Sequence, residues 1–157
     1  MIYYMGIPNS VKKSEIASRT PIDLIDVEPE QMTLDCQRHI HFLREYSQLL
    51  DPQKALKSEY AKWLLRTRSE IETLNKCKRF LSLLHTMEND RGGAWGVVAQ
   101  NGIKLDGSHR ASIAVYLHKK TIPVAIVQIF PEDAEWMVKM QEIINHKLLS
   151  LLPKGQS

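Results

Sequence analysis

Five consecutive residues near position 108 carry side chains that could act together in chemistry. Asp106, Gly107, Ser108, His109 and Arg110 follow an apolar run and precede a helical pattern. An ordinary turn from a strand into a helix needs only a glycine and a cap. An imidazole and a guanidinium in the first helical turn therefore make this stretch the first candidate for a binding site.

The groups in this turn suit an anion, and phosphate above all. Gly107 permits backbone angles that a side chain would forbid, and Ser108 is a candidate N-cap. A helix that begins here directs free backbone N–H groups into the space above the sheet. Arg110 adds a planar fork of donors that matches phosphate. His109 can donate a hydrogen bond or titrate near neutral pH, and Asp106 can orient it or hold a metal ion bound to phosphate. A plain solvated turn would have the same glycine and cap.

The elements on either side of the turn can be predicted from local pattern. Residues 94–105 contain two apolar runs that are split by Asn101-Gly102, the strongest short signal for a hairpin. A helix is expected from Ser108 to about His118, with small alanines on the side that would pack against a sheet. The turn should therefore join the second strand of a hairpin to a helix.

The rest of the chain predicts an α/β fold of the α+β kind. Residues 22–27 read as a short strand, residues 121–130 as a buried strand and residues 131–152 as a final helix. Residues 31–90 contain no glycine, and their apolar residues recur at helical spacing. The basic residues of this stretch are expected to form a solvated helix face, which is the commonest role of such a run. A contact with nucleic acid or anionic lipid is the less favoured alternative.

Length and composition place the chain among ordinary globular proteins. It has 157 residues, a hydrophobic fraction of 43% and a formal net charge of +3, which argues only weakly for an anionic partner. Its two cysteines, Cys36 and Cys77, have no spacing typical of a disulfide framework or a zinc site. No apolar run approaches the roughly 20 residues of a membrane span. We expect a soluble, cytoplasmic protein of one domain without a membrane span.

The segment LDGSHRASIAVYLHKKTIPVAIV resembles the signature segment of the ParB/sulfiredoxin-like superfamily. In that superfamily a strand, a turn of the D-G-x-H-R kind, a helix and a strand with a buried I-P-V occur in this order. The resemblance covers about residues 94–130, and TPIDLIDVEPEQ is similar to the first strand of the same fold. It implies one domain over residues 1–157 with a small mixed sheet, packed helices and a long helical insertion at about 31–90.

Three branches of this superfamily differ in the turn. Sulfiredoxins have a catalytic cysteine where this chain has Ser108, and chromosome-partitioning ParB proteins have a G-E-R-R turn. Free serine kinases have D-G-H-H-R, the turn most similar to D-G-S-H-R. They also place a glutamate, as general base, after the first strand in a segment ending P-H-E-Q. Here E-P-E-Q offers Glu30, with a register that differs by one residue, and Glu28 is an alternative base.

The resemblance implies a nucleotide-binding, kinase-like phosphotransferase that acts on a small hydroxyl compound such as an amino acid or a sugar. The nucleotide would be ATP or ADP, or else CTP, with Mg²⁺. Its phosphates would lie on Gly107, Ser108, His109 and Arg110. The catalytic residues would be Glu30, Asp106 and His109, and Asp106 would also face the metal ion. The alternative is a non-catalytic, nucleotide-sensing or DNA-associated ParB-like module, although nucleic acid is not the favoured partner.

Overall fold

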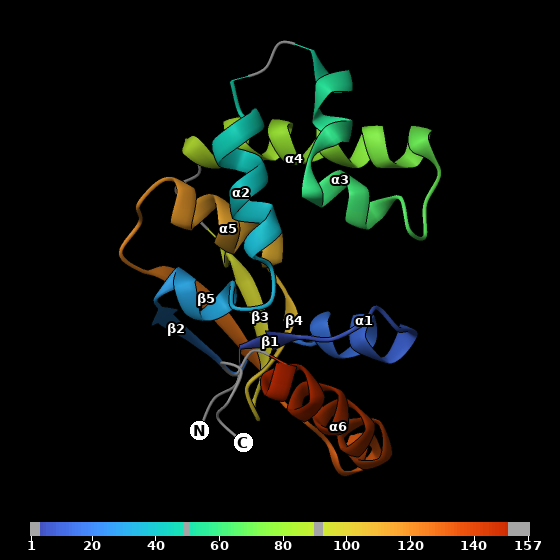
Figure 1. The fold of residues 1–157 in the computed structure, drawn as a ribbon. Coiled ribbons are helices and arrows are strands. Elements are labelled where there is room, and N and C mark those ends of the chain that lie inside the picture. The colour runs from blue at the N-terminus through green and yellow to red at the C-terminus, as the bar shows by residue number, and fades with distance from the viewer. Residues whose placement is uncertain (1–3, 49–50, 90–92, 151–157) are drawn as a thin grey trace.

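A five-stranded mixed sheet carries helices on both of its faces (Figure 1). The computed structural model describes residues 4–48, 51–89 and 93–150. The strands are β1 (Met5–Gly6), β2 (Asp23–Val27), β3 (Gly96–Ala99), β4 (Ile103–Asp106) and β5 (Ile122–Val127). They lie in the order β1-β4-β3-β5-β2. The β1–β4 and β3–β5 pairs are parallel, whereas the β3–β4 and β2–β5 pairs are antiparallel. The predicted mixed fold class is confirmed.

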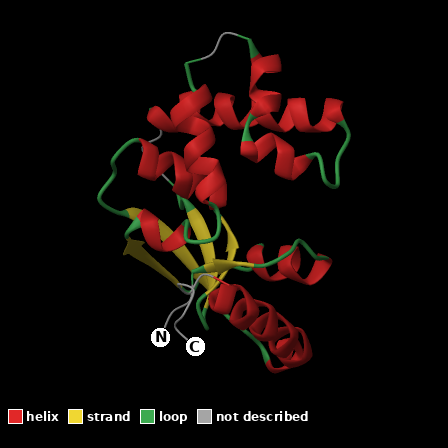
Figure 2. Cartoon of the chain, in the orientation of Figure 1, coloured by secondary structure: helices red, strands yellow, loops and turns green. Residues whose placement is uncertain are grey.

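Most of the helical residues lie between β2 and β3. That part of the chain holds the short 3₁₀ helices η1 (Pro29–Met32) and η2 (Pro52–Lys57), and the α-helices α2 (Gln37–Tyr46), α3 (Glu59–Leu64) and α4 (Glu70–Glu88). The other helices are α1 (Val11–Ala17), α5 (Ser108–Tyr116), η3 (Pro131–Asp133) and α6 (Ala134–Ser150). Helix α5 lies between the sheet and the group formed by α2, α3 and α4, while α1 and α6 lie on the other side of the sheet (Figures 1 and 2).

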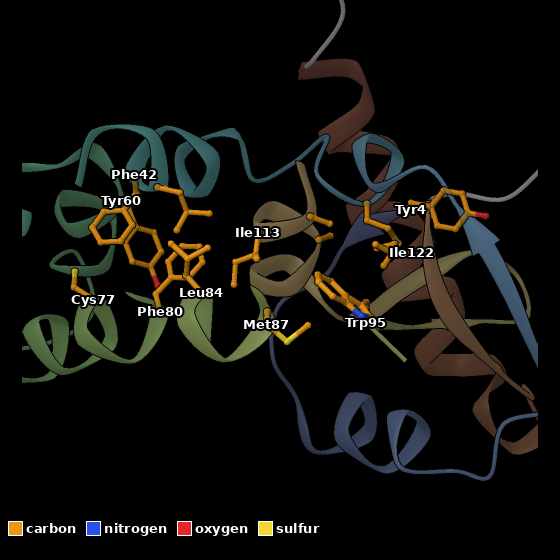
Figure 3. Close-up of a cluster of buried hydrophobic side chains, with 14 of the residues drawn as sticks. Tyr4, Phe42, Tyr60, Cys77, Phe80, Leu84, Met87, Trp95, Ile113 and Ile122 are labelled. Atoms are coloured by element: carbon orange, nitrogen blue, oxygen red, sulfur yellow. The ribbon is translucent and has the colours of Figure 1, made fainter. Parts of the chain in front are cut away.

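Two apolar cores hold these layers together, one on each face of the sheet. The larger core joins the helical group and α5 to the sheet, and Figure 3 shows it running from Phe42 and Tyr60 past Ile113 to Ile122. The smaller core joins α1 and α6 to the sheet through residues such as Ile144. Alternate side chains of β5, namely Ile122, Val124 and Ile126, pack in the larger core, because successive residues of a strand point to opposite faces.

A buried ion pair joins the sheet to the loop between η1 and α2. Lys104 in the middle of β4 is 2% exposed, and its Nζ donates to Asp35 Oδ1 at 2.7 Å and to the carbonyl of Met32 at 2.8 Å. Asp35 Oδ2 accepts the N–H of Gly6 at 2.7 Å. One lysine and one aspartate therefore connect β4, the η1–α2 loop and β1.

The structure confirms several local predictions and differs from others in where an element begins or ends. The hairpin of β3 and β4 turns at Asn101-Gly102, where Gly102 has a φ of 91°. The buried strand ends at Val127 rather than residue 130, and a 3₁₀ turn precedes the final helix, which begins at Ala134. The sequence reasoning missed β1 and α1. Residues 49–50 and 90 of the predicted helical stretch, and 151–152 of the predicted final helix, lie outside the described residues. Within the described ranges, no helix is long and apolar enough to cross a membrane.

Candidate functional site

The turn from β4 into α5 requires glycine at position 107. Gly107 has a φ of 114°, which side chains rarely adopt, and a Cβ there would lie 2.7 Å from the Cα of Gly96 and 2.8 Å from the carbonyl oxygen of Trp95. The Asp106 carboxylate accepts the N–H of Gly107 at 2.8 Å. Gly107 is thus the N-cap and Ser108 the first helical residue. The prediction of Ser108 as N-cap is wrong because the left-handed conformation that starts the helix falls one residue earlier.

The N-terminus of α5 leaves three backbone donors for an external anion. The N–H groups of the first turn of an α-helix have no partner inside the helix. Asp106 already occupies the N–H of Gly107, so the donors that remain are those of residues 108–110. Among the described residues, none accepts a hydrogen bond from these three N–H groups. The predicted set of donors, residues 107–110, is therefore reduced by one.

A cavity of about 300 Å³ lies where α4 faces the N-terminal end of α5. Its cationic lining comes from both helices: Lys76 and Arg79 from α4, and Arg110 from α5. Asp106 is the carboxylate of the lining. The complete lining is Tyr60, Lys76, Arg79, Phe80, Leu83, Asp106, Gly107, His109 and Arg110. The structure therefore brings Asp106, Gly107, His109 and Arg110 to one cavity, whereas Ser108 does not line it.

His109 projects from this turn into an aromatic cluster. Its ring centroid lies 4.7 Å from that of Phe80 and 4.8 Å from that of His39. Its Nε2 lies 3.0 Å from the hydroxyl of Tyr60. Burial, followed by the nearby charge of Lys76, lowers the pKa of His109 to about 4. At neutral pH the imidazole is uncharged, so it can contact an anion as a hydrogen-bond donor but not as a cation.

Arg110 is an exposed member of the cavity lining. Its Nη1 donates to the carbonyl oxygen of Ala94 at 2.9 Å, and the residue is exposed to solvent. This hydrogen bond ties the side chain to the segment that leads into β3. The remaining N–H groups of the guanidinium are available to an anion, because the group has five donors and cannot lose its charge at ordinary pH.

Glu30 does not share this cavity. It lines a second and larger cavity of about 720 Å³, together with Glu28 and residues near the C-terminal end of α5 such as Val115 and His118. The two cavities have no lining residue in common. The structure thus places the predicted base and the predicted phosphate turn at different ends of α5.

Five lining residues of the cavity were not assigned to the site by sequence reasoning: Tyr60, Lys76, Arg79, Phe80 and Leu83. Lys76 and Arg79 were expected to lie on a solvated face of the helical stretch, and Tyr60 and Phe80 only to belong to its apolar pattern. A signal existed for the two cations, since they are three positions apart and one of them precedes the core residue Phe80. No local pattern could show that this face of α4 meets the turn at Gly107.

Comparison with known proteins gives no match, neither to a family model nor to a curated protein nor to a solved structure. The resemblance to the ParB/sulfiredoxin-like superfamily therefore stays a prediction from the residues quoted above.

Proposed function

We propose that the cavity between α4 and α5 binds the phosphate groups of a nucleotide. The observation that carries this proposal is the meeting of three cationic side chains around one cavity, which is also lined by His109 and Arg110 of the first turn of α5, where backbone N–H groups are free. Lys76 and Arg79 stand opposite the turn, so an anion between the helices would receive donors from both sides. Gly107, which lines the cavity, lets the turn pack directly on the backbone of Trp95 and Gly96 and so fixes where α5 begins.

The amount of positive charge supports more than one phosphate group. A phosphate monoester carries about −1.5 to −2 at pH 7, and three cations would match a diphosphate better than a single phosphate. A volume of about 300 Å³ lies at the small end of the range for ligand pockets. The cavity would therefore hold the phosphates, and the rest of the nucleotide would lie outside it. ATP, ADP and CTP all meet this description, and such a ligand agrees with the expected cytoplasmic location.

Two activities remain open for a protein with this site. The place of Glu30 in a separate cavity favours the non-catalytic, nucleotide-sensing module, because the predicted base is not beside the phosphates. The carboxylate of Asp106 favours the kinase-like phosphotransferase, because it lines the phosphate cavity and could accept the proton of a hydroxyl compound. We propose nucleotide binding for both cases and assign the role of base, if transfer occurs, to Asp106 instead of Glu30.

Mg²⁺ is compatible with this site only as an ion that binds together with the phosphates of the nucleotide. Magnesium commonly binds to one or two carboxylates together with phosphate oxygens. Asp106 can supply one carboxylate, one oxygen of which also accepts the N–H of Gly107. No cluster of three or more acidic, histidine or cysteine residues suited to a metal is found among the described residues. The ion would neutralise phosphate charge, and in the non-catalytic module the protein would hold it through Asp106.

Calorimetric titration with ATP, ADP and CTP in the presence of Mg²⁺ tests the proposal. Arg79→Gln and Arg110→Gln should each weaken binding by about 10- to 100-fold, since a hydrogen bond to a charged group contributes roughly 1.5–3 kcal/mol. Arg66→Gln is the matched control, because Arg66 is an exposed arginine of the same helical region that does not line the cavity. The absence of binding to the wild type, or equal affinities in all three variants, would contradict the proposal.

A screen of amino acids and sugars for phosphoryl transfer separates the two activities. If transfer occurs, Asp106→Asn should abolish turnover, whereas Glu30→Gln should keep both turnover and nucleotide affinity. A loss of turnover in Glu30→Gln with normal turnover in Asp106→Asn would show that the assignment of the base is wrong. Nucleotide binding without transfer to any hydroxyl compound would favour the sensing module.

A further inference from the structure

Tyr60 connects the helical group to the phosphate cavity through a single hydroxyl. The residue lies on α3, is 1% exposed and also lines the cavity. Its hydroxyl is 3.0 Å from His109 Nε2, and within the described ranges it is the only group that forms a hydrogen bond with this ring. The side chain is thus placed to decide which nitrogen of His109 carries the proton.

The direction of this hydrogen bond determines what His109 can offer to an anion. A neutral imidazole has one N–H donor and one nitrogen with a lone pair. If Nε2 accepts from Tyr60, the proton resides on Nδ1, and the ring presents a donor. If Nε2 instead donates to the tyrosine oxygen, Nδ1 presents a lone pair, which repels a phosphate oxygen. Because Tyr60 engages Nε2, Nδ1 is the ring nitrogen left for a ligand, so only the first arrangement lets the ring donate to a phosphate oxygen.

We propose that Tyr60 is a positioning residue of the phosphate site: its hydroxyl donates to Nε2 of His109 and so holds the ring proton on Nδ1, as a donor for a phosphate oxygen. This inference rests on the proposed function, since it concerns the same cavity. Burial raises the pKa of Tyr60, so its hydroxyl keeps the proton that it must donate. No charge moves in this arrangement, because both side chains stay neutral.

The neighbouring rings hold His109 in the orientation that this arrangement needs. Phe80 meets the imidazole edge to face, with an angle of 87° between the planes, and His39 meets it at 67°. Figure 3 shows Tyr60 and Phe80 in the same cluster of buried side chains, beside Leu84. The aromatic neighbours restrict rotation of the ring, and the hydroxyl of Tyr60 acts on the position of the ring proton.

The tautomer can be measured directly by NMR of the protein with ¹⁵N-labelled histidine at pH 7. In the wild type, the spectrum should show a protonated Nδ1 and an unprotonated, hydrogen-bonded Nε2 for His109. In Tyr60→Phe, the ring should become a mixture of the two tautomers or change to the other one. The spectrum of the wild type tests the proposal even if Tyr60→Phe fails to fold.

Titration with pyrophosphate and with ATP measures the consequence for binding. Tyr60→Phe should bind both ligands about tenfold more weakly, which is the size expected when one hydrogen bond loses its preferred donor. Tyr116→Phe is the matched control, because it removes a hydroxyl that is hydrogen-bonded to Ser47 at 2.9 Å and does not line the cavity. The control should keep the affinity of the wild type.

The outcomes separate this inference from the proposed function. An Nδ1–H tautomer, together with a selective loss of affinity in Tyr60→Phe, supports the role of Tyr60. Binding by the wild type with an Nε2–H tautomer, or with equal affinity in Tyr60→Phe, overturns the inference and leaves the proposed function intact. A wild type that binds neither pyrophosphate nor nucleotide overturns both.

Discussion

Replacement of Lys104 by methionine should destabilise the protein strongly, although position 104 lies in a strand where an apolar residue would be ordinary. Removal of one partner of a buried ion pair costs about 3–5 kcal/mol, because the other charge is left uncompensated. Asp35 is 14% exposed and keeps its hydrogen bond from the N–H of Gly6, which moves the expected cost to the lower end. The carbonyl of Met32 also loses its donor, which adds about 1 kcal/mol.

We therefore expect Lys104→Met to lower the free energy of unfolding by about 3–4 kcal/mol, which corresponds to a fall in Tm of about 6–16 °C for a chain of this size. Urea unfolding and calorimetry would measure both quantities. Lys139→Met is the matched control, because Lys139 is an exposed lysine on α6, and its loss should change stability by less than about 0.5 kcal/mol.

Asp35→Asn provides a second test of the same ion pair. If the cost arises from a stranded carboxylate, Asp35→Asn in the Lys104→Met background should recover part of the lost stability, since the neutral amide still accepts the N–H of Gly6. If Lys104→Met is no less stable than Lys139→Met, or if Asp35→Asn adds a further loss to it, the account of this buried ion pair is refuted.

Three further predictions concern the turn and the acid stability of the protein. Gly107→Ala should lower the free energy of unfolding by at least about 2 kcal/mol in urea titrations, because the added Cβ meets backbone atoms and the left-handed conformation is strained. Asp133 accepts hydrogen bonds from Arg19, which hold the pKa of its carboxyl below the usual range, so the wild type should lose stability as the pH falls below about 4. In Asp133→Asn that part of the pH dependence should be absent from thermal unfolding curves. Burial lowers the pKa of His39 to about 2, so below about pH 6.5 the unfolded chain binds a proton that the folded protein does not. Stability should fall by on the order of 1–2 kcal/mol between pH 7 and pH 5 for this group, and His39→Phe should reduce the slope of thermal stability against pH.

The parts of the fold that local pattern determines were predictable from the sequence. The hairpin follows from Asn101-Gly102, whose type of turn joins strands of the right twist. Helix α5 follows from its apolar spacing and from the glycine before it. Strand β1 could not be found in this way, because a strand of two residues depends on its pairing with Ile103 and Lys104, about 100 residues further along the chain.

Of the two walls of the cavity, only the one formed by the turn before α5 was predictable from the sequence. The turn at residues 106–110 combines a glycine with His109 and Arg110 in the first helical turn, and the sequence alone shows both features. The opposite wall is formed by Lys76 and Arg79, whose role depends on the place where α4 packs against α5. Glu30 shows the converse: a residue of suitable chemistry, after the expected strand, lies in another cavity.

The order of the strands has a consequence for folding during synthesis. Val27 at the end of β2 pairs with Ile122 at the start of β5, and β5 is complete only about 100 residues after Val27. At about 5–20 residues per second, β2 waits roughly 5–20 s for its partner. Helices η2, α3 and α4 pack on one another and can form within this interval, whereas β2 keeps Leu24 and its unpaired backbone available to other chains. A chaperone would thus matter most during synthesis, while β2 has been made and β5 has not.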